Sequence, residues 1–387
     1  MVHQPDGSAF YLDHAATTAM RPEAIEAVTT AWTSSFGNAS GTHAVAQRAK
    51  NALEDARERA AAILGIERPH DIVFTSGGTE SDNLAVSGAA GTSGRRHIVV
   101  SAIEHKAVGG AAHALERHGY TVSEAGCGRD GIVTPEHVES VVSPDTAVVS
   151  VMAANNEIGT LQPIPELVAV VRERAPDAIF HTDAVQAFVG SPTSLASTGA
   201  DLLSLSAHKF GGPTGVGLLA TAPGVRIDPI VHGGGQEAGR RAGTSNVPGI
   251  VGMVAAMEAV ERERGRFESV VGAERDAFEA TLGRFVTGLV VNGAGSPRMP
   301  HFSHVRFPGI RAETILIRLD QEGVFAAAGS ACQSGAVEPS HVLTAMGMTT
   351  EEAASCVRFS FGWDTAPGEG ERAARAVAAV IDGLVPA

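Results

Sequence analysis

Residues 201–220 read DLLSLSAHKFGGPTGVGLLA. Two short apolar runs, 201–206 and 216–220, have the length of strands, and Lys209 lies between them at the start of a glycine-rich turn. Upstream, helical patterns at 79–90, 105–118 and 163–174 separate further apolar runs at 71–75, 97–101, 146–152 and 178–181. Strands that alternate with helices predict an α/β fold with a mainly parallel sheet and helices on both of its faces.

A different pattern begins after residue 246. The elements predicted there are a long helical region at 247–287, strands at 303–307 and 356–361, and helices at 311–322, 339–346 and 367–384. Together they predict a second, smaller α+β domain. The charged run ERER at 261–264 predicts a solvated face of the long helix.

The composition limits the classes of function. The chain has 387 residues, of which 44% are apolar and 19% charged, which is typical of a globular protein with a large core. Its net charge of −14 and its lack of a basic run argue against nucleic-acid binding. It has no apolar run of about 18 residues, and it begins without a basic and an apolar segment, so we expect neither a membrane helix nor a secretory signal.

Cysteine usage indicates the compartment. The chain has three cysteines, Cys127, Cys332 and Cys356, and no CxxC pair. Such a sparse, odd set argues against a disulfide framework or a zinc site. It favours a reducing environment, so we expect a cytoplasmic protein.

Lysine is rare in this chain, and one lysine is distinguished by its position. Of the 29 basic residues, three are lysines, namely Lys50, Lys106 and Lys209. Lys209 directly follows a predicted strand end and has Ser206 and His208 beside it. An amine at that place can form a Schiff base while the hydroxyl and the imidazole bind a phosphate. A surface lysine in a glycine loop would give the same pattern.

Other polar clusters also follow predicted strands. The segment TSGGTES at 75–81 can cradle a phosphate on free backbone N–H groups, or it is a tight turn with Thr79 as the helix cap. Asp183 can pair with a protonated ring nitrogen or cap a helix, and His105 can stack on a ring or be structural. A further cluster, NNEIG, lies at 155–159. We expect all of these at one edge of the sheet, where open α/β sheets bind ligands.

Taken together, these motifs resemble the class V group of fold-type-I pyridoxal-phosphate enzymes, and more narrowly the cysteine desulfurases. The segments that carry the narrower resemblance are YLDHAATT (11–18), FGNAS (36–40), HGGGQ (232–236), RAGT (241–244), AGSACQS (328–334) and VRFS (357–360). The resemblance extends from about residue 10 to residue 362. It implies a large cofactor-binding domain over 16–258 and a small domain formed by 1–15 and 259–387. The small domain would carry a mobile loop, about 326–337, with the catalytic cysteine.

The resemblance implies pyridoxal 5'-phosphate as the cofactor. Lys209 would hold it as a Schiff base and later move the α-proton of the substrate. Asp183 would keep the ring nitrogen protonated, and His105 would stack on the ring and assist proton transfer. The other implied contacts are Gln186 and Asn156 at the ring oxygen, Gly78, Thr79, Ser206 and His208 at the phosphate, and Thr244 from the second subunit of a homodimer.

The resemblance also implies the substrate, L-cysteine. Arg358 and Asn38 would bind its carboxylate, for which a guanidinium fork is suited. Cys332 would attack the substrate sulfur, giving L-alanine and an enzyme persulfide. A protein or small-molecule acceptor would then take the sulfur for iron–sulfur clusters, thio-cofactors or tRNA thiolation. We interpret Cys127 as an unreactive turn residue and Cys356 as an inert core residue.

Three other interpretations stay open. The first is another class V enzyme, such as a selenocysteine or cystine lyase or an aminotransferase, which would not need the loop around Cys332. In that loop this chain has Gln333, where the family often has serine or threonine. A sulfur carrier that uses Cys332 alone would leave Lys209 and Asp183 unexplained. A histidine-based metal enzyme is disfavoured because no HExxH arrangement is present, and we expect no metal.

Overall fold

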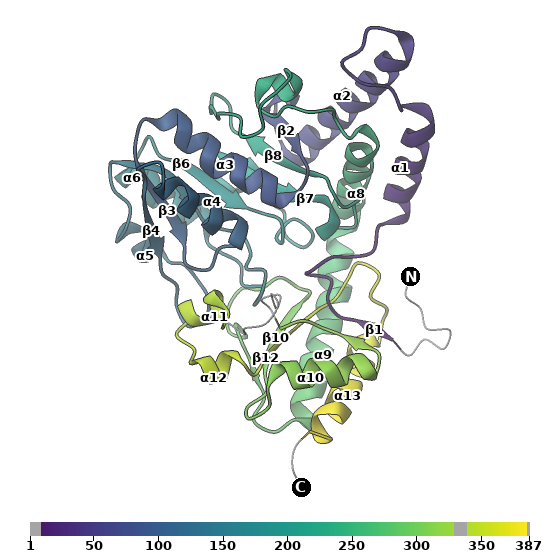
Figure 1. The fold of residues 1–387 in the computed structure, drawn as a ribbon. Coiled ribbons are helices and arrows are strands. Elements are labelled where there is room, and N and C mark those ends of the chain that lie inside the picture. Colours follow the sequence, from purple (N-terminus) through teal and green to yellow (C-terminus); the bar gives the residue numbers. More distant parts are fainter. Residues whose placement is uncertain (1–8, 329–338, 385–387) are drawn as a thin grey trace.

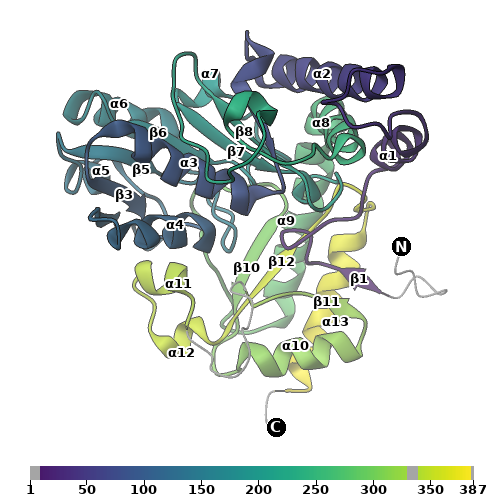
Figure 2. The same ribbon diagram turned by 45° about the horizontal axis from the view of Figure 1, so that its top comes forward.

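The computed structural model describes residues 9–328 and 339–384. The described chain forms a large part around one wide sheet and a small part around two narrow sheets, and Figure 1 shows the small part below the large one. The first and the last described elements, the strand Phe10–Tyr11 and the helix Glu369–Asp382, both belong to the small part (Figures 1 and 2).

The wide sheet of the large part has seven strands in the order β2-β8-β7-β6-β5-β3-β4. Their bounds are β2 Ile72–Thr75, β8 Gly217–Thr221, β7 Leu202–Ser206, β6 Ile179–Asp183, β5 Thr146–Ser150, β3 His97–Ser101 and β4 Thr121–Ala125. Strands β4, β3, β5, β6 and β7 pair in parallel. The predicted α/β fold with a mainly parallel sheet is confirmed.

Strand β8 is the exception, since it is antiparallel to both of its neighbours, β7 and β2. The physical reason lies in the connection from β7, residues 207–216, which is too short to contain a crossover helix. A parallel return needs a connection of about a dozen residues or more, whereas an antiparallel return needs only a turn. The glycine-rich segment after Lys209 provides that turn, with Gly211 at a φ of 87°.

Helices cover both faces of this sheet (Figure 2). Helices α3 Gly78–Ser93 and α4 Lys106–Glu116 pack together on one face. Ile98 and Val100 of β3 point into the core on that side, while Val99 between them belongs to the core on the other side. Burial on both faces explains why this strand is apolar throughout. The remaining helices of the large part are α1 Pro22–Ser34, α2 Ala44–Leu64, α5 Pro135–Glu139, α6 Ile164–Arg174, α7 Leu195–Thr198 and α8 Val247–Arg266.

The small part contains an antiparallel sheet in the order β12-β10-β9 and a parallel pair, β1-β11. The bounds are β1 Phe10–Tyr11, β9 Val290–Val291, β10 Phe302–Arg306, β11 Val324–Phe325 and β12 Cys356–Ser360 for the strands, and α9 Gly272–Phe285, α10 Ala312–Gln321, α11 His341–Ala345, α12 Thr350–Ala353 and α13 Glu369–Asp382 for the helices. A π-helical turn at Phe267–Val271 joins α8 to α9. The division at 258/259 stays a prediction, and it falls within α8.

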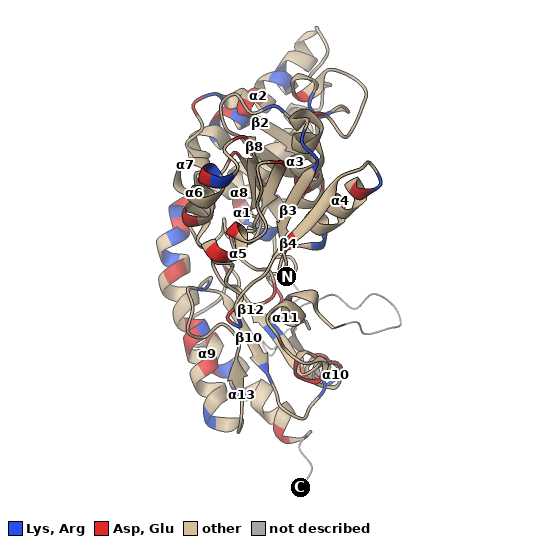
Figure 3. Ribbon diagram, turned by 90° about the vertical axis from the view of Figure 1, so that its left-hand side faces the viewer, with Lys and Arg blue, Asp and Glu red and all other residues tan. Residues whose placement is uncertain are grey.

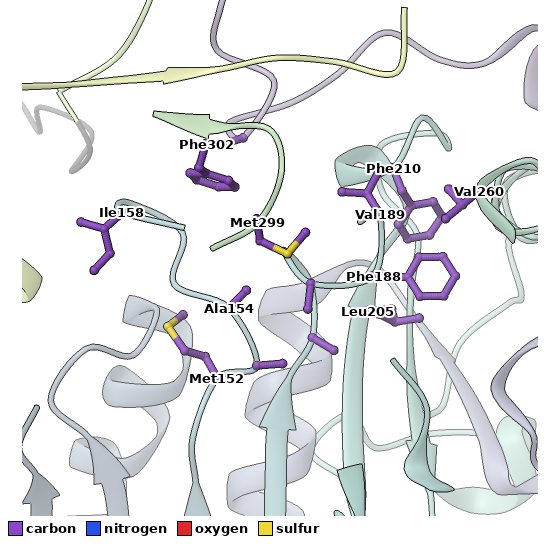
Figure 4. Close-up of a cluster of buried hydrophobic side chains, with 14 of the residues drawn as sticks. Met152, Ala154, Ile158, Phe188, Val189, Leu205, Phe210, Val260, Met299 and Phe302 are labelled. Atoms are coloured by element: carbon purple, nitrogen blue, oxygen red, sulfur yellow. The ribbon is translucent and has the colours of Figure 1, made fainter. Parts of the chain in front are cut away.

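The two parts share a hydrophobic core. Figure 4 shows Met299 and Phe302 of the small part beside Ala154 and Ile158 of the loop that follows β5. The approach is close at Gly159, where a Cβ atom would lie 2.4 Å from Cβ of Phe302. The φ of Gly159 is 78°, so this position favours glycine on both grounds. The contact anchors the small part beside the strand ends of the large sheet.

The charged run at 261–264 differs from its prediction. Figure 3 shows charges of both signs along α8 and α9, and Glu261 and Arg262 are exposed as expected. Glu263, however, accepts a hydrogen bond of 2.6 Å from Nη1 of the buried Arg21. Arg264 donates to the Phe188 carbonyl at 2.7 Å. Half of the run therefore holds α8 against its neighbours, because long side chains can reach across to buried polar groups.

Within 9–328 and 339–384, no helix combines the length and the apolar character that crossing a membrane requires.

Candidate active site

A cavity of about 430 Å³ lies where β5, β6 and β7 end, beside the start of α3. Most of the residues predicted for the site line it. They are Gly78, Thr79, His105, Asn156, Asp183, Gln186, Ser206, His208, Lys209 and Arg358. Apart from Arg358, which comes from the small part, these residues end or follow strands of the wide sheet at one edge, so the sheet brings them together.

Three predicted residues are not brought to this cavity by the described structure. Asn38 is exposed, and its Oδ1 accepts a hydrogen bond of 3.0 Å from the Ser40 N–H. Thr244 is also exposed and does not line the cavity of its own chain. Cys332 lies outside the described residues.

Lys209 ends a short 3-10 turn, Ala207–Lys209, directly after β7. Its Nζ donates to the carbonyl oxygens of Ala15 at 2.6 Å and Ala16 at 2.8 Å. Burial, with the nearby Arg358 cation, lowers the pKa of Lys209 to about 8. A substantial fraction of this amine is therefore neutral near physiological pH, the form that attacks a carbonyl carbon.

Asp183 is the last residue of β6 and is 6% exposed. Its Oδ1 accepts the Val185 N–H at 2.8 Å. Burial raises the pKa of Asp183, while the neighbouring His105 and Lys209 oppose that effect. A cationic ligand group beside this carboxylate would be strongly favoured, because the surroundings provide little solvation for an isolated charge.

His105 occupies the N-cap of α4, where its Nδ1 accepts the Ala107 N–H at 3.2 Å. The proton of the neutral ring therefore lies on Nε2. Burial lowers the pKa of His105, which keeps the ring neutral at physiological pH. A neutral imidazole at this position can stack on a flat ligand and exchange a proton through Nε2.

The segment 75–81 forms the turn from β2 into the first turn of α3. The alternative interpretation, with Thr79 as the cap, is wrong, because α3 begins at Gly78 and Gly77 occupies the N-cap without a side-chain hydrogen bond. A Cβ atom on Gly78 would lie 3.0 Å from Cγ2 of Val185 and 3.3 Å from Cβ of Ser206. Glycine thus lets the helix start close to the strand ends, where its free N–H groups and dipole favour an anion.

Arg358 lies on β12 of the small part and reaches into the cavity. Its Nη2 donates to Oδ1 of Asp13 and its Nη1 to the Asn156 carbonyl, each at 2.7 Å. Its Nε is buried and has no hydrogen-bond partner among the described residues. A buried guanidinium with a free donor is suited to binding a carboxylate.

Four further residues that line or support the cavity were missed in the sequence. Asp82 of α3 is 1% exposed, and within the described part of the chain its Oδ1 has no hydrogen-bond partner. Glu104 accepts from Ser101 Oγ and from the Met152 N–H, both at 2.7 Å, and burial raises its pKa to about 8. Glu157 and His341 also line the cavity. Glu104 and Glu157 are next to predicted site residues in sequence, and this proximity could have indicated a place in the site. No comparable local pattern indicates Asp82 or His341.

The residues of the cavity fit pyridoxal phosphate. The Lys209 amine suits an aldehyde, the Asp183 carboxylate a protonated ring nitrogen, and the start of α3 a phosphate. Oδ1 of Asn156 is buried and has no partner within 9–328 and 339–384, so this polar atom is unused by the described protein groups and suits a ligand group. The described residues contain no group of three or more side chains that could hold a metal ion.

Comparisons with known proteins agree with this site. The family model Aminotransferase class-V matches residues 10–369. Cysteine desulfurase IscS of Dictyoglomus turgidum is 42% identical over 355 residues, covering 91% of this chain and 89% of the relative. Putative cysteine desulfurase IscS 1 of Bacillus subtilis is 40% identical over 377 residues, covering 97% of this chain and 99% of the relative.

Solved structures show the same similarity. A NifS-like protein superposes with a TM-score of 0.90 at 33% sequence identity, covering 97% of this chain and 100% of the other. The structure of SspA in complex with cysteine gives a TM-score of 0.80 at 34% identity, covering 91% of this chain and 98% of the other. The chain therefore belongs to the class V aminotransferase family, and within it to the pyridoxal-phosphate-dependent cysteine desulfurases.

Proposed function

We propose that this desulfurase transfers the sulfur of L-cysteine to Cys332 and passes it from there to a protein or small-molecule acceptor. One observation carries the proposal, namely that the two ends of the described chain around Cys332 are tied to the cavity. Ala327 pairs with Arg358 through two backbone hydrogen bonds of 3.1 and 2.7 Å. Ser340 Oγ donates to Oε2 of Glu157, which lines the cavity, at 2.6 Å.

The cofactor contacts are proposed for the same side chains that line the cavity. When bound, pyridoxal phosphate supplies a ring that accepts electrons from the α-carbon of the substrate. Asp183 would hold the proton of the ring nitrogen, and His105 would stack on the ring with its Nε2 proton available. Gly78, Thr79, Ser206 and His208 would hold the phosphate, and Gln186 and Asn156 would contact the ring oxygen.

The substrate is oriented and activated by this chain's own groups. Arg358 binds the carboxylate of L-cysteine with its free Nε donor, which fixes the orientation of the α-carbon. Lys209 first anchors the cofactor and later, as a neutral amine, takes the α-proton. Its pKa of about 8 suits it for accepting and releasing a proton near neutral pH.

Sulfur transfer then needs a thiolate. Cys332 forms an S–S bond with the substrate sulfur, the C–S bond breaks, and its electron pair is protonated at the carbon that becomes the methyl group of alanine. L-Cysteine and a thiol thus give L-alanine and a persulfide, with no external oxidant. Burial raises the pKa of Cys127 and of Cys356 to about 11, so neither supplies a thiolate at neutral pH.

A homodimer accounts for the residues that lie away from the cavity. Asn38 and Thr244 are exposed in one chain, and Trp32 and Phe36, close to Asn38 in sequence, are 63% and 67% exposed. Large exposed apolar side chains favour a contact with another protein surface. We propose that Thr244 reaches the phosphate in the partner's cavity, and that Asn38 acts on a substrate carboxylate across the same interface.

The sulfur acceptor belongs to iron–sulfur, thio-cofactor or tRNA thiolation chemistry, and a cytoplasmic setting would keep the thiols reduced. The test is to mix the holoenzyme with L-cysteine, alkylate it rapidly and map the peptides by mass spectrometry. We expect the Cys332 peptide to carry one additional sulfur atom, with one alanine formed per persulfide. Alanine and free sulfide without any persulfide would instead support a lyase.

A further inference from the structure

A strained turn lies at Gln236–Gly239, in the loop between β8 and α8. The backbone is left-handed at Glu237 (φ 49°, ψ 38°) and at Ala238 (φ 56°, ψ 33°). Across residues 9–328 and 339–384, these are the two non-glycine residues with a positive φ. Left-handed backbone costs free energy in a residue that carries a Cβ atom, so other contacts must hold the turn.

The Glu237 side chain supplies these contacts. The side chain is 3% exposed, and its two carboxylate oxygens accept from Nη1 and Nη2 of Arg57, each at 2.8 Å. Oε2 also accepts the Phe74 N–H at 3.0 Å, and Arg57 Nη1 donates to the Ile72 carbonyl at 2.8 Å. A buried bidentate pair allows one geometry, so it fixes the turn on strand β2.

The chain after the turn is held as well. Arg241 donates from Nε to Oε1 of Glu80 at 2.7 Å and from Nη2 to Oε2 at 3.2 Å. Glu80 lies in the first turn of α3, beside the cavity. The Gly243 N–H donates to Oε1 of Gln236 at 3.2 Å. Thr244, the next residue, therefore follows a segment that is braced at both of its ends.

We propose that Arg57 and Glu237 are positioning residues for the active site of the neighbouring subunit. The buried pair holds the left-handed turn, and the braced loop then presents Thr244 to the phosphate bound by the partner. This inference rests on the homodimer of the proposed function and adds the residues that aim the contact. The turn and its ion pair do not line the cavity of their own chain, so a role there is not indicated.

Single variants measure the effect on cofactor affinity. Glu237→Gln keeps the size of the side chain and removes its charge, and Thr244→Val removes the proposed contact itself. Resolved apoenzyme is titrated with pyridoxal phosphate, followed by the visible absorbance of the cofactor. We expect each variant to raise the dissociation constant by about tenfold, as for loss of one charge-assisted contact. The double variant should be no weaker than Thr244→Val, because both act through one contact.

Glu258→Gln is the matched control. Glu258 accepts from Nε and Nη2 of Arg59 at 2.8 and 2.6 Å, so this pair is also bidentate and also involves α2. It is not part of the strained turn, and we expect the wild-type dissociation constant. Should Glu237→Gln not fold, Arg57→Lys is the second variant, since it keeps the charge and loses the bidentate fork. The same tenfold weakening is expected of it.

Mixed dimers separate an effect on the partner from an effect within one chain. Lys209→Ala silences the visible absorbance of one site. When Lys209→Ala is in one chain and Glu237→Gln in the other, the remaining Lys209 site faces an unaltered loop, and we expect wild-type affinity. When both changes are in the same chain and the partner is unaltered, the remaining site faces the altered loop, and we expect weak binding.

The possible outcomes discriminate between the two proposals. The reverse pattern in the mixed dimers would overturn the positioning role. The positioning role would also be overturned if Glu237→Gln or Arg57→Lys bound pyridoxal phosphate with normal affinity while Thr244→Val bound it weakly. In that case the dimer contact of Thr244 would still hold. Normal affinity in Thr244→Val, or a fully active monomer, would overturn the dimer contact on which this inference rests.

Discussion

Asp13 and Arg358 lie 345 positions apart in sequence, yet Oδ1 of Asp13 accepts a hydrogen bond of 2.7 Å from Nη2 of Arg358. This ion pair joins the N-terminal segment to β12 of the small part at the edge of the cavity. The carboxylate of Asp13 orients the guanidinium, and it also places a negative charge where the substrate carboxylate is proposed to bind.

These two roles of Asp13 can be separated. Asp13→Asn keeps an oxygen for Nη2 and removes the competing charge, so we expect the KM for L-cysteine to fall a few-fold. Arg358→Lys loses the planar fork, and we expect its KM to rise by roughly 10- to 100-fold with the cofactor still bound. Steady-state kinetics of alanine formation give both values. A higher KM in Asp13→Asn would show that orientation outweighs the charge.

The lowered pKa of Lys209 predicts a pH dependence of cofactor loading. Attack on the aldehyde needs the neutral amine, so the rate of reconstitution of apoenzyme should rise through a midpoint near pH 8 and not near the ordinary lysine value of 10.5. Between these two values the unfolded chain binds more protons at Lys209 than the folded chain does. The contribution of Lys209 to the stability of the apoenzyme should therefore increase with pH between about pH 8 and pH 10.5.

Stopped-flow absorbance at several pH values measures the loading rate, and thermal unfolding of the apoenzyme measures the stability. Lys209→Ala is the control, which should fold, lack the visible absorbance and lose this pH dependence. Borohydride reduction of the wild-type holoenzyme should label the peptide with Lys209. A label on Lys50 or Lys106 would contradict the assignment.

Asp82 and Asp183 line the same cavity, and we expect them to differ in charge. Burial and the Asp183 carboxylate hold the pKa of Asp82 well above its ordinary value of 3.8, which favours the neutral form of Asp82. Asp82→Asn, a neutral isostere, should keep the affinity for pyridoxal phosphate within about twofold. Asp183→Asn should weaken it by at least about tenfold, the equivalent of one pKa unit.

The stability of the apoenzyme provides a second measurement on Asp82. A raised pKa lowers the stability of the folded state as pH rises above 3.8, and an amide removes that effect. Asp82→Asn should therefore unfold at a higher temperature than wild type at pH 7, and the difference should shrink towards pH 4. An equal loss of affinity in both variants would mean that Asp82 carries a charge.

The assignment of Cys332 predicts a specific loss. Cys332→Ser should bind pyridoxal phosphate normally and still change its spectrum on addition of L-cysteine, because Lys209 and Arg358 are unchanged. It should form no persulfide, and sulfide release with a thiol reductant should fall to background. Cys127→Ser and Cys356→Ser are the matched controls and should keep full activity. Loss in either control, with an active Cys332→Ser, would identify a different nucleophile.

The sequence alone determined the fold class and identified most of the residues that line the cavity. The runs that became β3, β5, β6 and β7 are short and apolar, which is a local property of strands buried on both faces. Polar residues at or just after the strand ends, such as Asp183 and Lys209, could be placed together in one site, because parallel strands end at one edge of the sheet. Contiguous motifs then carried the resemblance to the family, because each motif contains its chemistry within a few residues.

Only the tertiary structure decided how these groups are supported. The carbonyls of Ala15 and Ala16 that accept from Lys209, and the Asp13 carboxylate that accepts from Arg358, come from a segment far away in the chain. The left-handed turn at Glu237 depends on Arg57, 180 positions earlier. The physical reason is that such contacts are set by where the packed elements bring distant side chains, and no spacing or periodicity along the chain encodes that distance.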